Sequence, residues 1–225
     1  MFERLVPLIG KTGLERLSRS RVLVVGTGGV GAHAVEALAR SGIGHLVLVD
    51  GDRVRESDLN RQLPALRSTL SKMKVEVLKA RIVDINPDCD VHAYPFFYDD
   101  DTKSLVWTTT YDFVVEAVDD IKKKLDIILT CKDRKIPFVT VCGQGRRMIP
   151  EKVTMVELSE SSGDPLAKRL RAELRRHGKL ENTPAVFSAE PPMAGGEGFV
   201  ASSAFVPAVA GLVAAGYVVR KLLED

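Results

Sequence analysis

The sequence predicts an α/β fold: one domain built around a doubly wound, Rossmann-like, mainly parallel sheet. Short apolar, β-branched segments alternate with segments of helix-forming composition, as in strand–helix–strand units. A glycine-rich loop lies between the first of these strands and the helix that follows it. The chain has 225 residues, 45% of them hydrophobic, which is enough to bury a substantial core. We therefore expect residues 1–225 to form a single domain.

The glycine loop follows the first expected strand, Val22–Val25, and precedes the first expected helix, Ala32–Arg40. Its four glycines are Gly26, Gly28, Gly29 and Gly31. Glycine allows a tight turn and a close approach of the backbone to phosphate, and the helix N-terminus offers N–H groups and partial positive charge. The loop therefore predicts a nucleotide site.

The second expected strand, Leu46–Val49, ends at Asp50. A carboxylate at this distance after a glycine loop, about twenty residues, accepts hydrogen bonds from ribose hydroxyls. Up to this point a nicotinamide dinucleotide and ATP fit the sequence equally well.

The remaining elements complete the sheet and its cover. Further strands are expected at Val91–Phe96, Phe113–Ala117 and Phe138–Val141, while Val153–Leu158 and Ala185–Ser188 either extend or cover the sheet. The C-terminal helix is expected at 204–223. The uncharged run 199–219 is long enough to cross a membrane, but its serine, proline, glycine and alanine content favours a helix packed on the sheet. We therefore predict no membrane span.

Arg61, Lys74 and Asp119 favour ATP over a dinucleotide. Cleavage of ATP at its α-phosphate needs cations at the developing charge and a ligand for magnesium. Arg61 and Lys74 are candidate cations, and Asp119, just after the apolar run 113–118, is the candidate metal ligand. The alternative is that the two cations lie on the surface and that Asp119 is a helix N-cap.

Five segments carry a family resemblance: Gly26–Gly31, Leu48–Asp52, Asn60–Gln62, Met73–Glu76 and Ile85–Pro87. Together they resemble the ThiF-like adenylation domain of the ubiquitin-activating enzyme superfamily. Three later segments resemble a narrower branch, the tRNA threonylcarbamoyladenosine dehydratases: Asp164–Arg171, Phe187–Glu190 and Ser203–Leu212. The resemblance covers nearly the whole chain. It implies ATP-dependent dehydration, with ring closure, of the modified adenosine in tRNA through an acyl adenylate.

The resemblance also assigns residues. The glycine loop cradles phosphate, Asp50 holds the ribose, and Asp52 lies near the nucleotide. The other residues it implies at the ATP site are Asn60, Arg61, Gln62, Lys74 and Asp119, of which Arg61, Lys74 and Asp119 are catalytic and Asp119 is the magnesium-associated acid. Asp58 stands where relatives commonly have asparagine, which adds negative charge near the phosphates. The resemblance to this branch also suggests a bound monovalent cation, but no set of ligands for it can be read from this sequence.

The resemblance further implies partners. A homodimer is expected, in which Arg4 matches an arginine that reaches the partner's ATP site in some relatives, and a cysteine desulfurase system is an open partner. The odd cysteine count and the absence of a signal peptide indicate the cytoplasm. Cys89, Cys131 and Cys142 are not paired at metal-ligand spacing, so a structural zinc is disfavoured. No thiol lies at 188–203, and Cys131 and Cys142 are expected to be small buried residues rather than nucleophiles, so a protein thioester is disfavoured as well. Ala201 stands where a relative has a cysteine.

A basic segment at 168–179 predicts contact with RNA. The segment is expected to form a helix with an apolar stripe of leucines. Its candidate tRNA-binding residues are Lys168, Arg169, Arg171, Arg175 and Arg176. Arg146 and Arg147 are expected to assist. The alternative is an ordinary solvated amphipathic helix. The glycine-rich loop 191–198 either folds over the nucleotide or is disordered.

Three other functions compete with the dehydratase. An enzyme that adenylates a ubiquitin-like sulfur carrier would share the ATP residues but often has paired cysteines, and here these are absent. A nicotinamide-dependent dehydrogenase would leave Arg61 and Lys74 unexplained. An inactive regulatory subunit is disfavoured because Arg61, Lys74 and Asp119 are all present.

Overall fold

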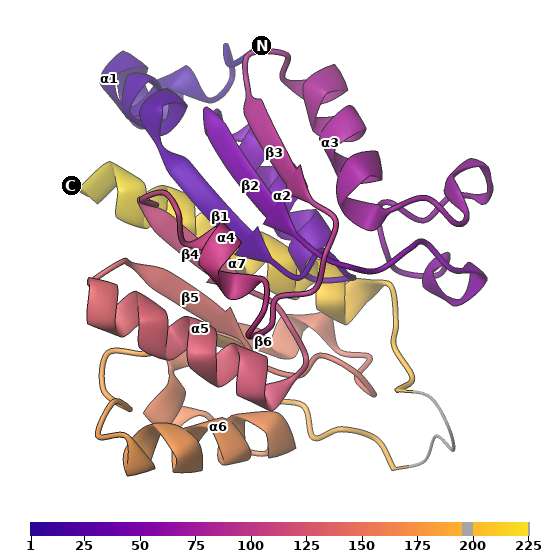
Figure 1. Ribbon diagram of the computed structural model, residues 1–225, viewed down its shortest axis with the longest axis vertical. Coiled ribbons are helices and arrows are strands. Elements are labelled where there is room, and N and C mark those ends of the chain that lie inside the picture. The colour runs from indigo at the N-terminus through magenta and orange to yellow at the C-terminus, as the bar shows by residue number, and fades with distance from the viewer. Residues whose placement is uncertain (195–199, 225) are drawn as a thin grey trace.

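The computed structural model describes residues 1–194 and 200–224, which form a seven-stranded sheet with helices on both faces (Figure 1). The strands are β1 (Arg21–Val25), β2 (His45–Val49), β3 (Asp90–Tyr94), β4 (Phe113–Glu116), β5 (Phe138–Val141), β6 (Val153–Glu157) and β7 (Pro184–Ser188). Their order is β3-β2-β1-β4-β5-β7-β6, and every pairing is parallel except that of β6 with β7. The predicted doubly wound, mainly parallel sheet is therefore confirmed.

The helices are α1 (Val6–Arg19), α2 (Gly31–Arg40), α3 (Lys74–Ile85), α4 (Lys103–Val106), α5 (Ile121–Arg134), α6 (Pro165–Arg176) and α7 (Phe205–Glu224). Alternate residues of each central strand point to opposite faces. In β1, Val22 and Val24 join a core with residues of α2, α3 and α7, whereas Leu23 and Val25 join a second core with residues of α5 and α6. Figure 1 shows α5 in front of the sheet and α7 behind it. Both faces are covered, as a parallel sheet requires.

Some boundaries differ from those expected. β3 ends at Tyr94, two residues before the expected end, because the chain turns at Pro95. The basic helix α6 begins at Pro165, where Asp164 is the N-cap, and ends at Arg176 because Gly178 takes φ 64°. Lys179 therefore lies outside this helix.

The C-terminal helix α7 is long and apolar enough to cross a membrane by length and composition. It packs closely on α2, however: a Cβ added at Gly211 would lie 2.3 Å from the Val30 carbonyl oxygen. Val206, Ala210 and Ala214 are among its buried side chains. In its apolar window, 44% is buried inside the protein, and packing accounts for that part of its apolar composition.

Candidate active site

A cleft of about 690 Å³ opens at the carboxyl ends of β1, β2 and β4. This is where the strand order of the sheet reverses, since β2 and β4 lie on opposite sides of β1. Nine of the residues predicted from the sequence line the cleft: Gly26, Gly28, Gly29, Asp50, Asp52, Arg61, Gln62, Lys74 and Asp119. The strand ends therefore collect side chains that are far apart in the sequence.

Two predicted residues do not line the cleft but support it. Gly31 is the first residue of α2, and a Cβ there would lie 1.8 Å from the Gly26 carbonyl oxygen, so only glycine fits. Asn60 is exposed; its amide donates to the Ser202 carbonyl oxygen (2.9 Å) and its Oδ1 accepts from Arg61 (3.0 Å). Asn60 thus joins the loop that carries Arg61 to the segment before α7.

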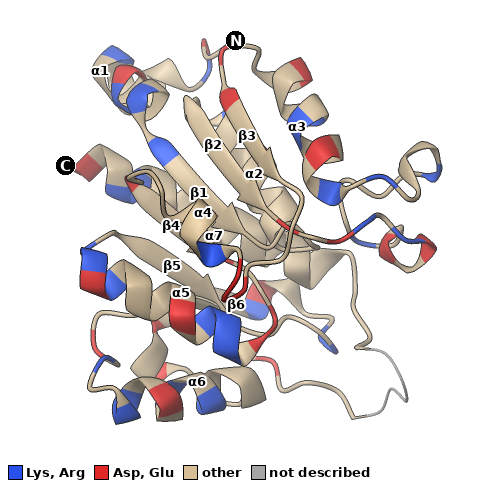
Figure 2. Cartoon of the chain, in the orientation of Figure 1, with Lys and Arg blue, Asp and Glu red and all other residues tan. Residues whose placement is uncertain are grey.

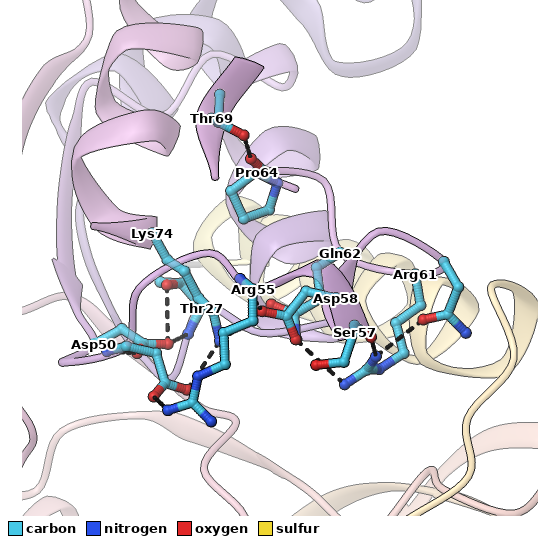
Figure 3. A network of polar contacts seen from close by, with 12 residues as sticks. Thr27, Asp50, Arg55, Ser57, Asp58, Arg61, Gln62, Pro64, Thr69 and Lys74 are labelled. Atoms are coloured by element: carbon cyan, nitrogen blue, oxygen red, sulfur yellow. Dashed lines mark hydrogen bonds and ion pairs between the residues drawn. The ribbon is translucent and has the colours of Figure 1, made fainter. Parts of the chain in front are cut away.

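Asp50 holds the glycine loop in place. Its Oδ2 accepts from the Thr27 backbone N–H (2.7 Å) and hydroxyl (3.0 Å), and its Oδ1 accepts from the Asp52 N–H (2.8 Å). Figure 3 shows Thr27 and Asp50 side by side. The residue assigned to the ribose therefore also ties the end of β2 to the loop after β1.

The two predicted cations are held by carboxylates. Lys74, whose side chain is 5% exposed, places Nζ 2.9 Å from Asp52 Oδ2 and 3.8 Å from Asp58 Oδ2. Arg61 Nη2 lies 3.6 Å from Asp58 Oδ1, and Nη1 donates to the Ser57 carbonyl oxygen (2.7 Å). Figure 3 shows Lys74, Asp58 and Arg61 in one polar network. Both cations are therefore paired with acids at the wall of the cleft.

Asp58 is itself fixed by its neighbours. Its carboxylate accepts from the Arg55 N–H (3.0 Å) and from Gln62 Nε2 (2.8 Å), and the residue is 5% exposed. The extra negative charge noted in the sequence therefore lies between the two cations, and it keeps both side chains at the wall of the cleft.

Asp119 and Asp120 have different roles at the end of β4. Asp120 is the N-cap of α5, and its carboxylate accepts from the backbone N–H groups of Lys122 (2.8 Å) and Lys123 (3.1 Å). The hydrogen bond from the Lys123 N–H lowers the pKa of Asp120. Asp119 is exposed in the cleft and makes no hydrogen bond or ion pair with the described residues. The alternative assignment of Asp119 as an N-cap is wrong, because Asp120 takes that place.

The sequence did not point to several other lining residues. Lys123 lies over the ring of Phe97, with Nζ 5.1 Å from the ring centroid, and Gln144 enters from the loop after β5. Nothing in the local pattern separates Lys123 from its two lysine neighbours. Beneath the cleft, Glu116 and Lys124 form an ion pair with no exposed surface. A glutamate in an otherwise apolar strand is the signal that would have found that pair.

The described residues contain no group of three or more His, Cys, Asp or Glu side chains placed to hold a metal ion by themselves. The three cysteines are free and buried. Burial raises the pKa of the Cys89 thiol to about 11 and those of Cys131 and Cys142 to about 12. These thiols are therefore protonated near neutral pH, which agrees with the absence of a cysteine nucleophile.

The basic helix is only partly available to RNA. Of its candidate residues, Arg171 is half-buried and donates to the Ser161 carbonyl oxygen (2.6 Å); the others are exposed: Lys168, Arg169, Arg175 and Arg176. Figure 2 shows the cations of α6 along its length.

The expectation that Arg147 assists tRNA binding is wrong. Arg147 is 2% exposed and donates to Asp164 Oδ2 (2.7 Å) and to the Glu190 carbonyl oxygen (2.8 Å). Of the loop 191–198, residues 195–198 lie outside the described residues.

Comparison with known proteins identifies the family to which this chain belongs. The model of the ThiF family matches residues 2–225. The chain belongs to the ThiF family. This membership confirms the superfamily resemblance, and with it the type of fold that the glycine loop and the Asn60–Gln62 motif had indicated.

Two relatives are similar over almost their whole length. The tRNA threonylcarbamoyladenosine dehydratase of Bacillus subtilis is 40% identical, over 100% of this chain and 95% of that protein. The crystal structure of the Escherichia coli tRNA N6-threonylcarbamoyladenosine dehydratase, TcdA, in complex with ATP matches with a TM-score of 0.93 and 34% identity, covering 99% of this chain and 93% of that one. The same enzyme in complex with AMP matches with a TM-score of 0.91 and 34% identity, over 97% and 92%.

Proposed function

We propose that this ThiF-family chain is an ATP-dependent tRNA threonylcarbamoyladenosine dehydratase. The observation that carries the proposal is the cleft, in which a glycine loop, two cations and an exposed carboxylate from separate segments face one space. The B. subtilis relative, similar over its full length, bears the name of this activity, and the E. coli enzyme binds ATP and AMP. These similarities support the same reaction here.

In the first step, a carboxylate oxygen of the threonylcarbamoyl group attacks the α-phosphorus of ATP. The bond from that phosphorus to the bridging oxygen breaks, pyrophosphate leaves, and an acyl adenylate remains. Negative charge grows on the phosphate oxygens, and Arg61 and Lys74 are the cations that offset it. For both to do so, they exchange contacts with Asp52 and Asp58 for contacts with phosphate.

Asp119 is the residue that we propose to hold magnesium. Magnesium is usually bound through one or two carboxylates together with substrate phosphates, and it does not need a cage of protein ligands. An exposed carboxylate in the cleft, without a partner among the described residues, fits that donor set. Bound there, the ion would supply positive charge to the phosphate oxygens. A monovalent cation remains a proposal without assigned ligands.

In the second step, a nucleophilic atom of the same substituent attacks the activated acyl carbon, a ring closes, and AMP leaves. The net change in the nucleoside is the loss of one water. Since nucleophile and electrophile belong to one group, proximity supplies much of the rate, and no enzyme thiol is required. The buried cysteines agree with this route.

The exposed cations of α6 are the proposed contacts to tRNA phosphates. We propose that Arg146, which is half-buried in the loop after β5, assists them. We propose that the protein forms a homodimer in which Arg4 reaches the partner's ATP site. We also propose that it is located in the cytoplasm and that a cysteine desulfurase system is a candidate partner.

The decisive experiment incubates the protein with ATP, magnesium and tRNA carrying threonylcarbamoyladenosine, followed by gentle digestion and mass spectrometry of the nucleosides. A nucleoside lighter by one water, formed only with ATP, is the expected result. Unchanged nucleosides despite ATP binding would overturn the proposal and favour a sulfur-carrier protein as the substrate of adenylation.

A further inference from the structure

We propose that Lys124 and Glu116 are positioning residues. Their buried ion pair joins the carboxyl ends of β4 and β5, and it sets the place of the two loops that carry Asp119 and Gln144 into the cleft. The turnover measurement for this inference rests on the proposed function. The geometric part of the inference concerns only the binding of ATP with magnesium.

The contacts of the pair reach both strand ends. One oxygen of Glu116, Oε1, accepts from the Val118 backbone N–H (2.8 Å), directly before Asp119. The other, Oε2, accepts from the Thr140 hydroxyl (2.5 Å) and from Lys124 Nζ. Lys124 Nζ also donates to the Val141 carbonyl oxygen (2.9 Å), at the last residue of β5. The loop that begins after Val141 carries Gln144.

The pair has no role as a ligand contact of its own. Glu116 and Lys124 are both 0% exposed and do not line the cleft, so neither touches a bound molecule. On this side of the sheet, Val114 of β4 and Ile128 of α5 are buried in the same apolar core.

Stability alone does not explain the pair. Buried ion pairs lose their hydration, and hydrophobic replacement of both partners is often neutral or stabilising. What such a replacement would lose here is the acceptor for the Val118 N–H and the donor to the Val141 carbonyl. These two backbone groups lie where the chain leaves β4 and β5 for the cleft. The geometry therefore points to placement of the site as what the pair provides.

The test compares variants that separate stability from placement. Lys124→Met leaves Glu116 buried without its cation, so we expect the melting temperature to fall by about 6–20 °C. The affinity for ATP with magnesium should fall at least fivefold and pyrophosphate release at least tenfold. Adding Glu116→Leu removes the uncompensated charge and should restore most of the melting temperature. It should not restore ATP affinity or turnover, because the Val118 N–H then loses its acceptor and the Val141 carbonyl still lacks its donor.

Two further variants sharpen the comparison. Glu116→Gln, added to Lys124→Met, keeps an oxygen that can accept from the Val118 N–H. This double variant should recover at least half of the ATP affinity lost in Lys124→Met, whereas the double variant with Glu116→Leu should not. Ile128→Ala is the matched control, since Ile128 is fully buried one turn further along α5. It should lower the melting temperature by about 4–20 °C while leaving ATP affinity within twofold.

The measurements are calorimetric titration with ATP and magnesium, thermal unfolding, and amide hydrogen exchange of the segment 117–120. Faster exchange at the Val118 amide in the Glu116→Leu variant, with slow exchange in the Glu116→Gln variant, is the expected pattern. ATP affinity that returns to the wild-type value together with stability in Lys124→Met/Glu116→Leu would overturn the inference, as would an equal loss of affinity in Ile128→Ala. A wild-type protein that binds ATP but does not dehydrate the nucleoside would refute the proposed function alone. The ATP affinities and the amide exchange rates of the variants would still test the role of the ion pair.

Discussion

The neighbouring acids Asp119 and Asp120 allow a test of the site at single-residue resolution. Asp119 is exposed in the cleft without a partner among the described residues, whereas the carboxylate of Asp120 accepts two backbone hydrogen bonds at the start of α5. Alanine at the two positions should therefore have opposite consequences. One substitution should affect activity and the other stability.

The magnitudes follow from these environments. Asp119→Ala removes no hydrogen bond or ion pair within residues 1–194 and 200–224, so the free energy of unfolding should change by less than about 0.5 kcal/mol. Loss of its electrostatic contribution should slow pyrophosphate release by about 10² to 10³-fold, or roughly 2.7–4 kcal/mol in the barrier. Asp120→Ala removes an N-cap and should cost about 1 kcal/mol of stability, which lowers the melting temperature by about 2–4 °C for a chain of this size. Its adenylation rate should stay within threefold of wild type.

The assay measures pyrophosphate release at saturating ATP and modified tRNA, beside thermal unfolding of the same preparations. Asp119→Ala should regain part of its rate at high magnesium concentration if this residue holds the ion. The reasoning is refuted if Asp119→Ala keeps more than a tenth of the wild-type rate, or if Asp120→Ala loses activity as severely while its stability is unchanged.

Three other predictions concern the cations and the loop. Lys74→Met should lower the free energy of unfolding by about 3 kcal/mol, because two carboxylates lose their buried cation. The same variant should show no adenylation in a pyrophosphate assay. Lys72 is exposed, and Lys72→Met should change neither the free energy of unfolding nor the rate of adenylation. Gly31→Ala should give no soluble folded protein, since its Cβ would meet a backbone oxygen at 1.8 Å, whereas Gly28→Ala, with nothing nearer than 3.9 Å, should fold with a normal circular dichroism spectrum. Replacing three exposed cations of α6 by glutamine should weaken tRNA binding and reduce the slope of log affinity against log salt by about 3, without changing ATP affinity; a salt-independent loss would contradict the role of the helix. Those cations are Lys168, Arg169 and Arg175.

Much of the site was readable in the sequence because its signals are local. An apolar strand followed by glycines specifies a strand–turn–helix unit, and the carboxyl ends of parallel strands meet at one edge of the sheet. Gly26 and Asp50 directly follow such strands and Asp119 lies three residues after the end of β4, so their arrival at a common cleft required only the correct fold class.

Other features depend on contacts between distant segments. The residues paired with Lys74 lie 22 and 16 positions away, at Asp52 and Asp58, and no local pattern specifies which acid meets which cation. Arg147 looked like a surface cation beside Arg146, yet it is buried because Asp164 and Glu190 converge on it from α6 and from the segment after β7. A residue's formal charge does not determine its burial; the presence of partners does.

The sequence by itself determined the strand and helix pattern, the glycine loop and the chemical types gathered at the strand ends, since these depend on periodicity and on residues adjacent in the chain. Only the tertiary structure decided that Asp120 rather than Asp119 caps α5, that β6 runs antiparallel to β7, and that Glu116 and Lys124 meet beneath the cleft. The cap depends on the direction in which the chain leaves β4, whereas the antiparallel pairing and the ion pair depend on contacts closed across the fold. Such geometry exists only when the segments are packed together.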